Sequence, residues 1–217
     1  DQSISIGWQI LEAGYNVTIL DDLSTGYEKL IPKKADFIKC NINDTEVITS
    51  LLQKKTFSAV IHFAGSIKVE ESVKFPEKYF TNNTNNSKKL FATCLKNDLT
   101  NIIFSSTAAV YGNPTSSGLI NENAKLNPLN PYAESKIKTE QNLMNLSKDK
   151  IKCIILRYFN VAGSDPNMRS GLIAKNPTHL IKVACETIVG KRDKVIIFGN
   201  NYDTQDGTAV RDYIHVS

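Results

Sequence analysis

The sequence predicts an α/β fold with a doubly wound parallel sheet. Short β-branched or apolar segments alternate with segments of helical periodicity along the 217 residues, and this alternation is typical of parallel β-α-β units. Polar residues directly follow several predicted strands, at the place where open parallel sheets bind ligands. With 41% hydrophobic and 22% charged side chains, the composition excludes a disordered chain, a collagen and a coiled coil.

The first half of the chain predicts three helices and three strands. Ile4, Trp8 and Leu11 recur at helical spacing, and the pattern stops at Gly14, a residue suited to the left-handed end of a helix. The expected elements are a helix over 3–13, strands over 17–20 and 37–38, a helix over 46–52, a strand over 59–63 and a longer helix over 77–96.

The second half continues the alternation. The expected elements are a strand over 101–105, a helix over 131–146 that Pro131 opens, a strand over 153–157, a helix over 178–189 and a strand over 194–198. From Phe159 onwards several Gly and Pro residues make the pattern irregular. The sequence therefore predicts a larger domain over 1–158 and part of a smaller segment over 159–217 that lies over the site.

Charge and cysteine usage exclude several classes of partner. The formal charge of +4 comes from 26 basic and 22 acidic residues, and the lysines occur singly or in pairs. A basic stripe with interleaved aromatic residues is missing, so no nucleic-acid partner is predicted. Neither a bilayer-spanning apolar run nor a secretory signal is found, which predicts a cytoplasmic protein without a membrane partner. The four cysteines lack C-x-x-C spacing, and no metal site is predicted.

Tyr132 and Lys136 form a candidate catalytic pair, because residues four apart share one face of a helix. A tyrosine must lose about 3 pKa units to act as a base near pH 7, and a neighbouring ammonium, helped by a cationic cofactor ring, is one means of lowering it. Ser105, Ser106 and Thr107 follow a strand and offer a hydroxyl that shares the proton. The alternatives are an incidental pair in a Lys-rich helix and ordinary turn chemistry.

Asp21 is a candidate ligand for a dinucleotide. It ends a short buried strand, where the second strand of a dinucleotide-binding unit presents a carboxylate to the adenosine ribose hydroxyls. A carboxylate there favours NAD over NADP, because it repels a 2′-phosphate. The alternative is a solvated aspartate in a turn.

Several sequence blocks together carry a family resemblance. They are LEAGYNVTILDDLSTG, VIHFAGSIKVEESV, the triplet NNT at 82–84, IIFSSTAAVYGNP, NPYAESK, LRYFNVAGSDP and IFGNNYDTQDGTAVRDYIHV. Over essentially its whole length the chain resembles UDP-glucose 4-epimerases of the extended short-chain dehydrogenase/reductase family. The resemblance implies a Rossmann-like fold, NAD as cofactor and a UDP-sugar as substrate.

The reaction implied by the resemblance is epimerisation at C4 of UDP-glucose and UDP-galactose. In such enzymes the tyrosine takes the proton of the sugar 4-hydroxyl and hydride passes to the nicotinamide. The 4-keto sugar then turns over, and the hydride returns to its other face. NAD is recycled, so no reductant is consumed.

The resemblance also assigns roles to single positions. Tyr132 becomes the catalytic base, Lys136 its electrostatic partner and Thr107 the hydroxyl that shares the proton. The implied cofactor-binding residues are Asp21, Asp22 and Thr25 at the adenosine ribose, Asn41 and Ile42 at the adenine, and Phe63, Ala64, Gly65, Asn82, Tyr132, Lys136 and Phe159 along the rest of NAD. The implied substrate-binding residues are Thr107 and Tyr132 at the sugar, Asn160, His179, Leu180 and Arg211 at the diphosphate, and Ile197 and Phe198 near the uracil.

The chain departs from the family pattern at both ends. Family members begin with a strand and a G-x-x-G-x-x-G turn that holds the NAD pyrophosphate, and no such glycine fingerprint occurs here. The strands expected at 17–20 and 59–63 would then lack their shared central neighbour. We therefore expect the polypeptide as given to carry no stoichiometric NAD and to show no epimerase activity. It also stops at Ser217, whereas the family continues.

Three alternative functions stay open beside the epimerase. The chain could be an inactive fragment of such an enzyme, which the departures at both ends favour. A nucleotide-sugar dehydratase of the same fold needs a carboxylic acid after Thr107, where the sequence has Ala108 and Ala109. A UDP-N-acetylhexosamine epimerase differs in pocket volume. The resemblance further suggests a homodimer formed through the helices over 77–96 and 131–146.

Overall fold

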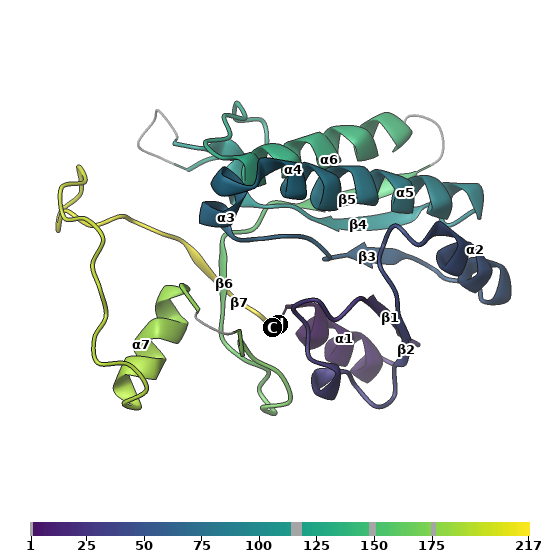
Figure 1. Cartoon of the computed structure of the whole chain (residues 1–217), viewed down its shortest axis with the longest axis horizontal. Helices are drawn as coiled ribbons and strands as arrows, with labels where there is room; N and C mark the ends of the chain where they lie inside the picture. Colours follow the sequence, from purple (N-terminus) through teal and green to yellow (C-terminus); the bar gives the residue numbers. More distant parts are fainter. Residues whose placement is uncertain (1, 114–118, 148–150, 175–176) are drawn as a thin grey trace. The chain divides into compact units, whose positions relative to one another are not determined.

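The computed structural model describes the whole chain except residues 1, 114–118, 148–150 and 175–176. Its first elements are α1 (Gln2–Glu12), β1 (Thr18–Asp21), η1 (Glu28–Leu30), β2 (Asp36–Lys39), α2 (Thr45–Lys54), β3 (Val60–His62), α3 (Val69–Lys74), α4 (Pro76–Tyr79), η2 (Phe80–Asn86) and α5 (Ser87–Lys96) (Figure 1). The elements that follow are β4 (Asn101–Ser105), η3 (Ala108–Tyr111), α6 (Pro131–Ser147), β5 (Lys152–Leu156), β6 (Asn160–Ala162), α7 (Leu180–Ile188) and β7 (Tyr213–His215).

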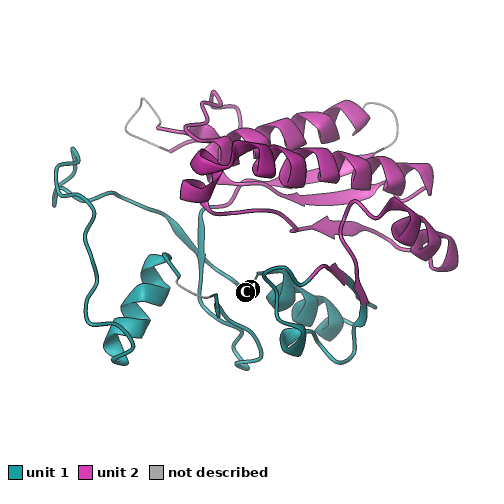
Figure 2. Ribbon diagram, viewed as in Figure 1, with its two compact units in different colours: residues 1–19, 23–37, 159–217 teal, residues 20–22, 38–158 magenta. Residues whose placement is uncertain are grey.

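The chain divides into two compact units (Figure 2). Unit 1 comprises residues 1–19, 23–37 and 159–217, and unit 2 comprises residues 20–22 and 38–158. The first helix therefore belongs to the same unit as the C-terminal segment. Most of the predicted catalytic residues lie in unit 2.

Unit 2 is built on a parallel sheet with the strand order β3-β4-β5. Its register places Val60 opposite Ile102, and Ile102 opposite Cys153. Helices α5 and α6 cover one face of this sheet (Figure 1). The hydrophobic core between helices and sheet consists of Ile42, Ile48, Leu90, Phe91, Cys94, Leu99, Ile102, Phe104, Leu143 and Ile151. The predicted α/β class with parallel strands is confirmed.

Strands β1 and β2 form a separate two-stranded sheet, so within the described part of the chain β1 and β3 do not pair. Helix α1 leads into β1 and ends as the sequence predicts. Gly14 has a φ of 88°, and the Tyr15 amide donates to the Ile10 carbonyl at 3.2 Å. This left-handed turn closes the helix and redirects the chain into the strand.

The helix predicted over 77–96 is interrupted. Its middle, η2, is a π-helix between α4 and α5. A π-helix displaces main-chain groups from the usual bonding pattern, and here the Asn83 carbonyl accepts a hydrogen bond from Thr139 Oγ1 of α6 at 2.8 Å. The polar run NNTNN at 82–86 thus packs against α6 through specific hydrogen bonds.

The strand predicted over 194–198 is wrong, because these residues form no regular element. Ile196, Ile197 and Phe198 are 58%, 71% and 94% exposed. A β-branched run becomes a strand only where another strand pairs with it, and in the described chain none pairs here. Instead β6 and β7 pair in parallel, with Asn160 opposite Tyr213, in a region that the sequence predicts as irregular.

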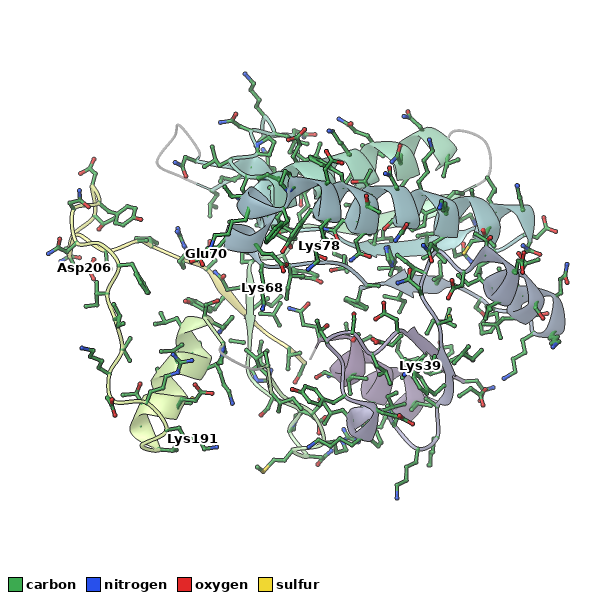
Figure 3. All side chains as sticks on the ribbon, in the orientation of Figure 1. Lys39, Lys68, Glu70, Lys78, Lys191 and Asp206 are labelled. Atoms are coloured by element: carbon green, nitrogen blue, oxygen red, sulfur yellow. The ribbon has the colours of Figure 1, made fainter. Side chains whose placement is uncertain are left out.

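Charged side chains are spread over exposed positions of the chain. Lys39, Lys68, Glu70, Lys78, Lys191 and Asp206 are all exposed and come from different parts of the sequence (Figure 3).

Candidate active site

The carboxyl ends of β4 and β5 in unit 2 bring the predicted hydroxyl residues to one edge of the sheet. The Ser106 amide donates to the Leu156 carbonyl at 2.9 Å, and the Ala108 amide donates to the Tyr158 carbonyl at 3.0 Å. Residues 105–107 therefore run beside the end of β5, one step past the last strand pair. The Ser105 and Tyr158 hydroxyls share a short hydrogen bond.

Lys136 extends from α6 into the interior of unit 2. Its side chain is 3% exposed, and its Nζ donates to the Ser105 carbonyl at 2.9 Å. The ammonium also lies 5.0 Å from the centroid of the Phe104 ring. Burial lowers the pKa of Lys136 to about 8, and the negative charge of Glu140 on the next turn of α6 opposes this shift.

Tyr132 lies close enough to Thr107 for the Thr107 side chain to affect its pKa. The Thr107 hydroxyl accepts from the Ala109 amide at 3.2 Å and caps η3. Burial raises the pKa of Tyr132, and the side chain of Thr107 lowers it in part. The net shift of the Tyr132 pKa is upward. The lowered pKa that we expected from the neighbouring lysine is therefore not found in the chain by itself.

The loop after β3 is held close to the same lysine by Asn83. Asn83 Oδ1 accepts from the Ser66 amide at 2.7 Å, and its Nδ2 donates to the Ser66 carbonyl at 2.9 Å. A Cβ on Gly65 would lie 3.0 Å from Asn83 Oδ1 and 3.6 Å from Lys136 Nζ. Asn82, which the sequence analysis selected, donates from Nδ2 to the Ser66 hydroxyl at 3.1 Å. The π-helix thus positions this loop through two adjacent asparagines.

A buried ion pair lies one helical turn beyond Lys136. Glu140 is 0% exposed, and its Oε2 lies 2.6 Å from Nη2 of Arg157 at the end of β5. Glu140 Oε1 accepts a short hydrogen bond from the Ser106 hydroxyl. Arg157 Nη1 donates to the Tyr111 hydroxyl at 3.0 Å.

The residues predicted for the adenosine end of a cofactor form a separate group. Asn41 Nδ2 donates to Asp22 Oδ2 at 2.8 Å, and the Asn41 amide donates to Asp44 Oδ2 at 2.8 Å. The carbonyl of Asp21 accepts from the Cys40 amide at 3.2 Å. The side chain of Ile42 belongs to the hydrophobic core. A contact of Ile42 with adenine would therefore be made by its main chain. Thr25 is exposed in unit 1.

Two of the predicted substrate residues in unit 1, Asn160 and His179, lie next to Tyr213. Asn160 pairs with Tyr213 across β6 and β7, and its Nδ2 donates to the Asp212 carbonyl at 3.1 Å. The His179 ring packs edge-on against Tyr213, with 6.1 Å between the ring centroids. His179 Nε2 is buried and has no hydrogen-bond partner in the described part of the chain. Arg211 is exposed just before β7, and its Nη1 donates to the Val210 carbonyl.

The other predicted ligand residues are not drawn into this group. Phe159, Leu180, Ile197 and Phe198 are 48%, 52%, 71% and 94% exposed. Phe63 is partly buried and Ala64 is exposed after β3.

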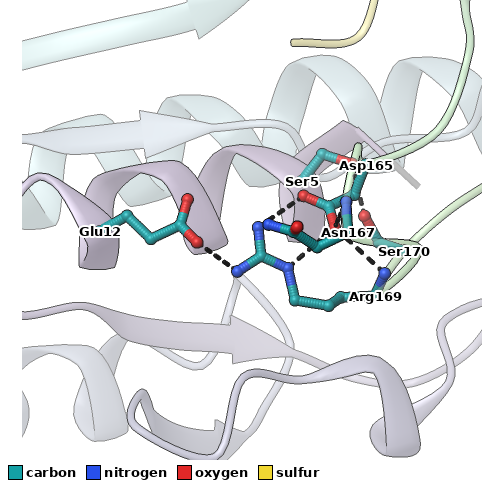
Figure 4. A network of polar contacts seen from close by, with 6 residues as sticks. All are labelled: Ser5, Glu12, Asp165, Asn167, Arg169 and Ser170. Carbon is teal, nitrogen blue, oxygen red and sulfur yellow. Dashed lines mark hydrogen bonds and ion pairs between the residues drawn. The ribbon is translucent and has the colours of Figure 1, made fainter.

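A second polar cluster, also in unit 1, joins α1 to residues 165–170 (Figure 4). Arg169 Nη2 lies 2.7 Å from Asp165 Oδ1, and Nη1 of the same guanidinium pairs with Glu12. The guanidinium also covers the Trp8 ring at 4.5 Å. The Ser5 and Ser170 hydroxyls lie 2.7 Å apart.

Sequence reasoning missed several residues that hold the unit 2 site together. The sequence indicates Ser106 only as a possible hydroxyl donor and Asn83 only as a possible polar orienter or a surface residue, and it gives Glu140 no role. One signal for Glu140 is available in the sequence, because it continues the spacing Tyr132, Lys136, Glu140 along one face of a 17-residue helix. Tyr213 lies inside the block that carries the resemblance, yet nothing in its spacing indicates contact with His179.

No helix in the described ranges is long and apolar enough to cross a membrane. Among these same residues no group of three or more His, Cys, Asp or Glu side chains is placed to hold a metal ion.

Comparison with known proteins shows similarity along almost the whole chain. The family model of the NAD dependent epimerase/dehydratase family matches residues 8–217. The chain is 46% identical over 209 residues to UDP-glucose 4-epimerase of Azospirillum brasilense, which covers 96% of this chain and 60% of that protein.

Solved structures show the same similarity. The crystal structure of UDP-glucose 4-epimerase from Brucella ovis in complex with NAD matches with a TM-score of 0.94 and 36% identity, over 99% of this chain and 66% of that one. The structure of the UDP-Glc/GlcNAc 4-epimerase from Campylobacter jejuni matches with a TM-score of 0.79 and 40% identity, over 99% of this chain and 67% of that one.

The chain spans 60% of the length of the Azospirillum brasilense relative and 63% of that of Lactobacillus helveticus. The matched part includes the hydroxyl segment, the tyrosine and lysine of α6 and the Asn83 loop. The extent of the family match and these identities establish that the chain belongs to the NAD dependent epimerase/dehydratase family.

Proposed function

We propose that the protein interconverts UDP-glucose and UDP-galactose by NAD-dependent epimerisation at C4, through a 4-keto intermediate. The observation that carries this proposal is the arrangement of Thr107, Tyr132 and Lys136 in unit 2. The Tyr132 phenol lies near Thr107 and on the same helix face as a buried ammonium, at the carboxyl edge of a parallel sheet. The names of the relatives support the same reaction.

The residues around Lys136 fit a nicotinamide ribose. One of its three N–H groups donates to the Ser105 carbonyl in the described structure, which leaves donors for ribose hydroxyls. Gly65 has no side chain, so the main chain of its loop can lie close to Asn83 and Lys136. When bound, NAD supplies a hydride acceptor and donor for the sugar carbon. We further propose Asp21, Asp22, Thr25, Asn41, Ile42, Phe63, Ala64, Asn82 and Phe159 as its other contacts.

Tyr132 is proposed as the base that removes the proton of the sugar 4-hydroxyl and later returns it. Thr107, whose side chain lies near the phenol, is proposed to share this proton. Since burial alone raises the pKa of Tyr132, the ionised phenol needs positive charge nearby. The protonated Lys136 and the cationic ring of oxidised nicotinamide are both suited to that role.

The residues of unit 1 are proposed to hold the nucleotide. Arg211 provides a forked donor suited to a diphosphate, and Asn160 donates to the carbonyl of the following residue, Asp212. The unsatisfied Nε2 of His179 is a further polar atom available to this ligand, and Leu180 follows it on α7. Ile197 and Phe198 are proposed to contact the uracil.

The function is tested on the chain supplied with the first strand and glycine turn of the family. It is incubated with NAD and UDP-galactose, without added reductant, and the UDP-sugars are separated by chromatography. The expected result is the same mixture of UDP-glucose and UDP-galactose from either starting sugar, with no net loss of NAD. If both NAD and UDP-sugar bind and no interconversion occurs, the proposed function is wrong.

A second candidate substrate is UDP-N-acetylglucosamine. The Campylobacter jejuni relative, 40% identical, is described as a UDP-Glc/GlcNAc 4-epimerase. The same assay with UDP-N-acetylgalactosamine decides between a single and a dual specificity. We also propose that the protein forms a homodimer through α4, η2, α5 and α6, which light scattering after gel filtration tests directly.

A further inference from the structure

The carboxylate of Glu140 is completely buried although the proposed mechanism gives it no role. It is 0% exposed, and both of its oxygens accept hydrogen bonds from Arg157. Oε1 also accepts the hydroxyl hydrogen of Ser106. A buried carboxylate is retained in a core only when such partners compensate for the lost hydration.

The bond from Ser106 joins two parts of the catalytic arrangement. Ser106 lies between Ser105, whose carbonyl receives Lys136, and Thr107, whose side chain lies near Tyr132. Glu140 stands on α6, one turn beyond Lys136 and two turns beyond Tyr132. The segment 105–107 is therefore hydrogen-bonded to α6 at two consecutive residues, Ser105 and Ser106.

We propose that Glu140 is a positioning residue. Through Ser106 it fixes the segment that carries Thr107 onto the helix that carries Tyr132 and Lys136. Arg157 holds the carboxylate in the orientation that Ser106 requires, because its Nε and Nη2 donate to both Glu140 oxygens at 2.6 to 3.2 Å. The kinetic consequence of this proposal rests on the proposed function. The expected change in the titration midpoint of Tyr132 does not depend on that function.

A second contribution of Glu140 is electrostatic. Its negative charge raises the pKa of Lys136 against the effect of burial, which favours the protonated ammonium. The other charged or titratable groups near this pair are Arg157 and Tyr111 beyond Glu140, His62 of β3, and Tyr79 and Tyr158 beside Tyr132.

The sharpest test is Ser106→Ala, because this variant removes the bond between segment and helix and leaves the Glu140–Arg157 pair intact. Ser72→Ala is a matched control: Ser72 is also 0% exposed, and its hydroxyl donates to the Val69 carbonyl at 2.6 Å within α3. Both variants lose one buried hydroxyl with one hydrogen bond. Only Ser106→Ala should disturb Tyr132.

The first readout needs neither cofactor nor turnover. The chain is labelled with 3-fluorotyrosine, and the ¹⁹F resonance of Tyr132 is identified by its loss in Tyr132→Phe. In Ser106→Ala the titration midpoint of Tyr132 should rise relative to wild type, since a displaced Thr107 no longer lowers it. An unchanged midpoint, or an equal rise in Ser72→Ala, would overturn the proposal whether or not the protein is an epimerase.

The second readout is kinetic. Ser106→Ala should lower kcat for UDP-galactose by about ten- to a hundredfold while KM stays the same, because misplacement of a reacting group costs rate rather than substrate binding. A rise in KM at constant kcat would contradict a positioning role. If wild type shows no turnover, the proposed function fails, and the titration of Tyr132 still decides the role of the bond.

Glu140 itself is tested in a double-mutant cycle of Ser106→Ala with Glu140→Gln. Coupled residues give non-additive effects, so Ser106→Ala should change the Tyr132 midpoint less in the Glu140→Gln background. Additive effects would show that Ser106 acts independently of Glu140. Should Glu140→Gln not fold, Ser106→Ala against Ser72→Ala remains decisive.

Discussion

Lys136 donates a hydrogen bond from Nζ to the Ser105 carbonyl at 2.9 Å, inside a region where its side chain is 3% exposed. A charged group so placed loses most of its hydration. The lowered pKa, from 10.5 to about 8, corresponds to roughly 3 kcal/mol of unfavourable burial of the ammonium. The buried ammonium of Lys136 therefore lowers the stability of the folded protein.

Lys136→Met should for this reason make the protein more stable at pH 7. Removal of the buried charge is offset in part by the lost hydrogen bond, so we expect a net gain of about 1–2 kcal/mol in the free energy of unfolding. The folded-state pKa of Lys136 lies below the unfolded one. Lys136 therefore destabilises the folded wild type less and less as pH rises from about 8 to 10.5.

Urea unfolding at pH 7 and pH 10 measures this difference. The gap between Lys136→Met and wild type should be large at pH 7 and small at pH 10. Lys138→Met, which removes a lysine with 48% side-chain exposure from the same helix, should show no such dependence. A Lys136→Met variant less stable than wild type at pH 7 would contradict this account.

Gly65→Ala should destabilise the loop after β3. The added Cβ would lie 3.0 Å from Asn83 Oδ1, the atom that accepts the Ser66 amide. Displacing Asn83 costs about 1–3 kcal/mol, as overpacking usually does, and should weaken NAD binding. Urea unfolding and isothermal titration with NAD measure the two effects.

Gly7→Ala is the matched control for this substitution. Gly7 lies inside α1, and its added Cβ would meet only Ile19 Cδ1 at 3.9 Å, so alanine should stabilise the helix by about 0.5–1 kcal/mol. If Gly65→Ala proved as well tolerated as Gly7→Ala, the close packing at Gly65 would have no functional meaning.

Arg169→Met should release α1 from residues 165–170. The guanidinium bridges Glu12 and Asp165 over the only tryptophan, Trp8, so native Trp8 emission should change. The Arg169 guanidinium also lowers the pKa of Asp165 to about 2. Because the folded-state pKa of Asp165 is lowered, its stabilisation is present above pH 3.8 and is lost as pH falls through about 2.

Trp8 fluorescence in urea at pH 6 and pH 2 follows this loss. Wild type should unfold at higher urea than Arg169→Met at pH 6, and the difference should shrink at pH 2. Arg192→Met, which breaks a pair with Glu186, should leave native Trp8 emission unaltered. A pH-independent difference between wild type and Arg169→Met would exclude Asp165 as the linked group.

Much of the fold follows from local sequence patterns. The Ile4, Trp8 and Leu11 spacing with Gly14 predicts α1, and the strand over 101–105 is found at those residues. These elements depend on periodicity and on end signals that lie within one segment. The strand expected over 194–198 fails because its formation depends on a pairing partner elsewhere in the chain.

The sequence predicts those residues of the candidate site whose type and position indicate their chemistry. Tyr132, Lys136 and Thr107 stand out by type and position. All three lie in unit 2, where Lys136 donates to the carbonyl of Ser105, two residues before Thr107. Asn83, Ser106 and Glu140 act through contacts over sequence separations of 17 to 34 residues. A π-helix in the middle of a regular helical pattern also gives no periodic signal, so the sequence could not reveal how Asn83 is placed.

The central claim is that Tyr132 exchanges the proton of the sugar 4-hydroxyl. Tyr132→Phe keeps the ring that packs against Tyr79, with 6.4 Å between centroids, and removes only the phenolic oxygen. With NAD and UDP-galactose supplied, the rate of UDP-glucose formation should fall by about 10³-fold or more, while calorimetry shows UDP binding unchanged. Near-normal turnover by Tyr132→Phe would contradict the claim.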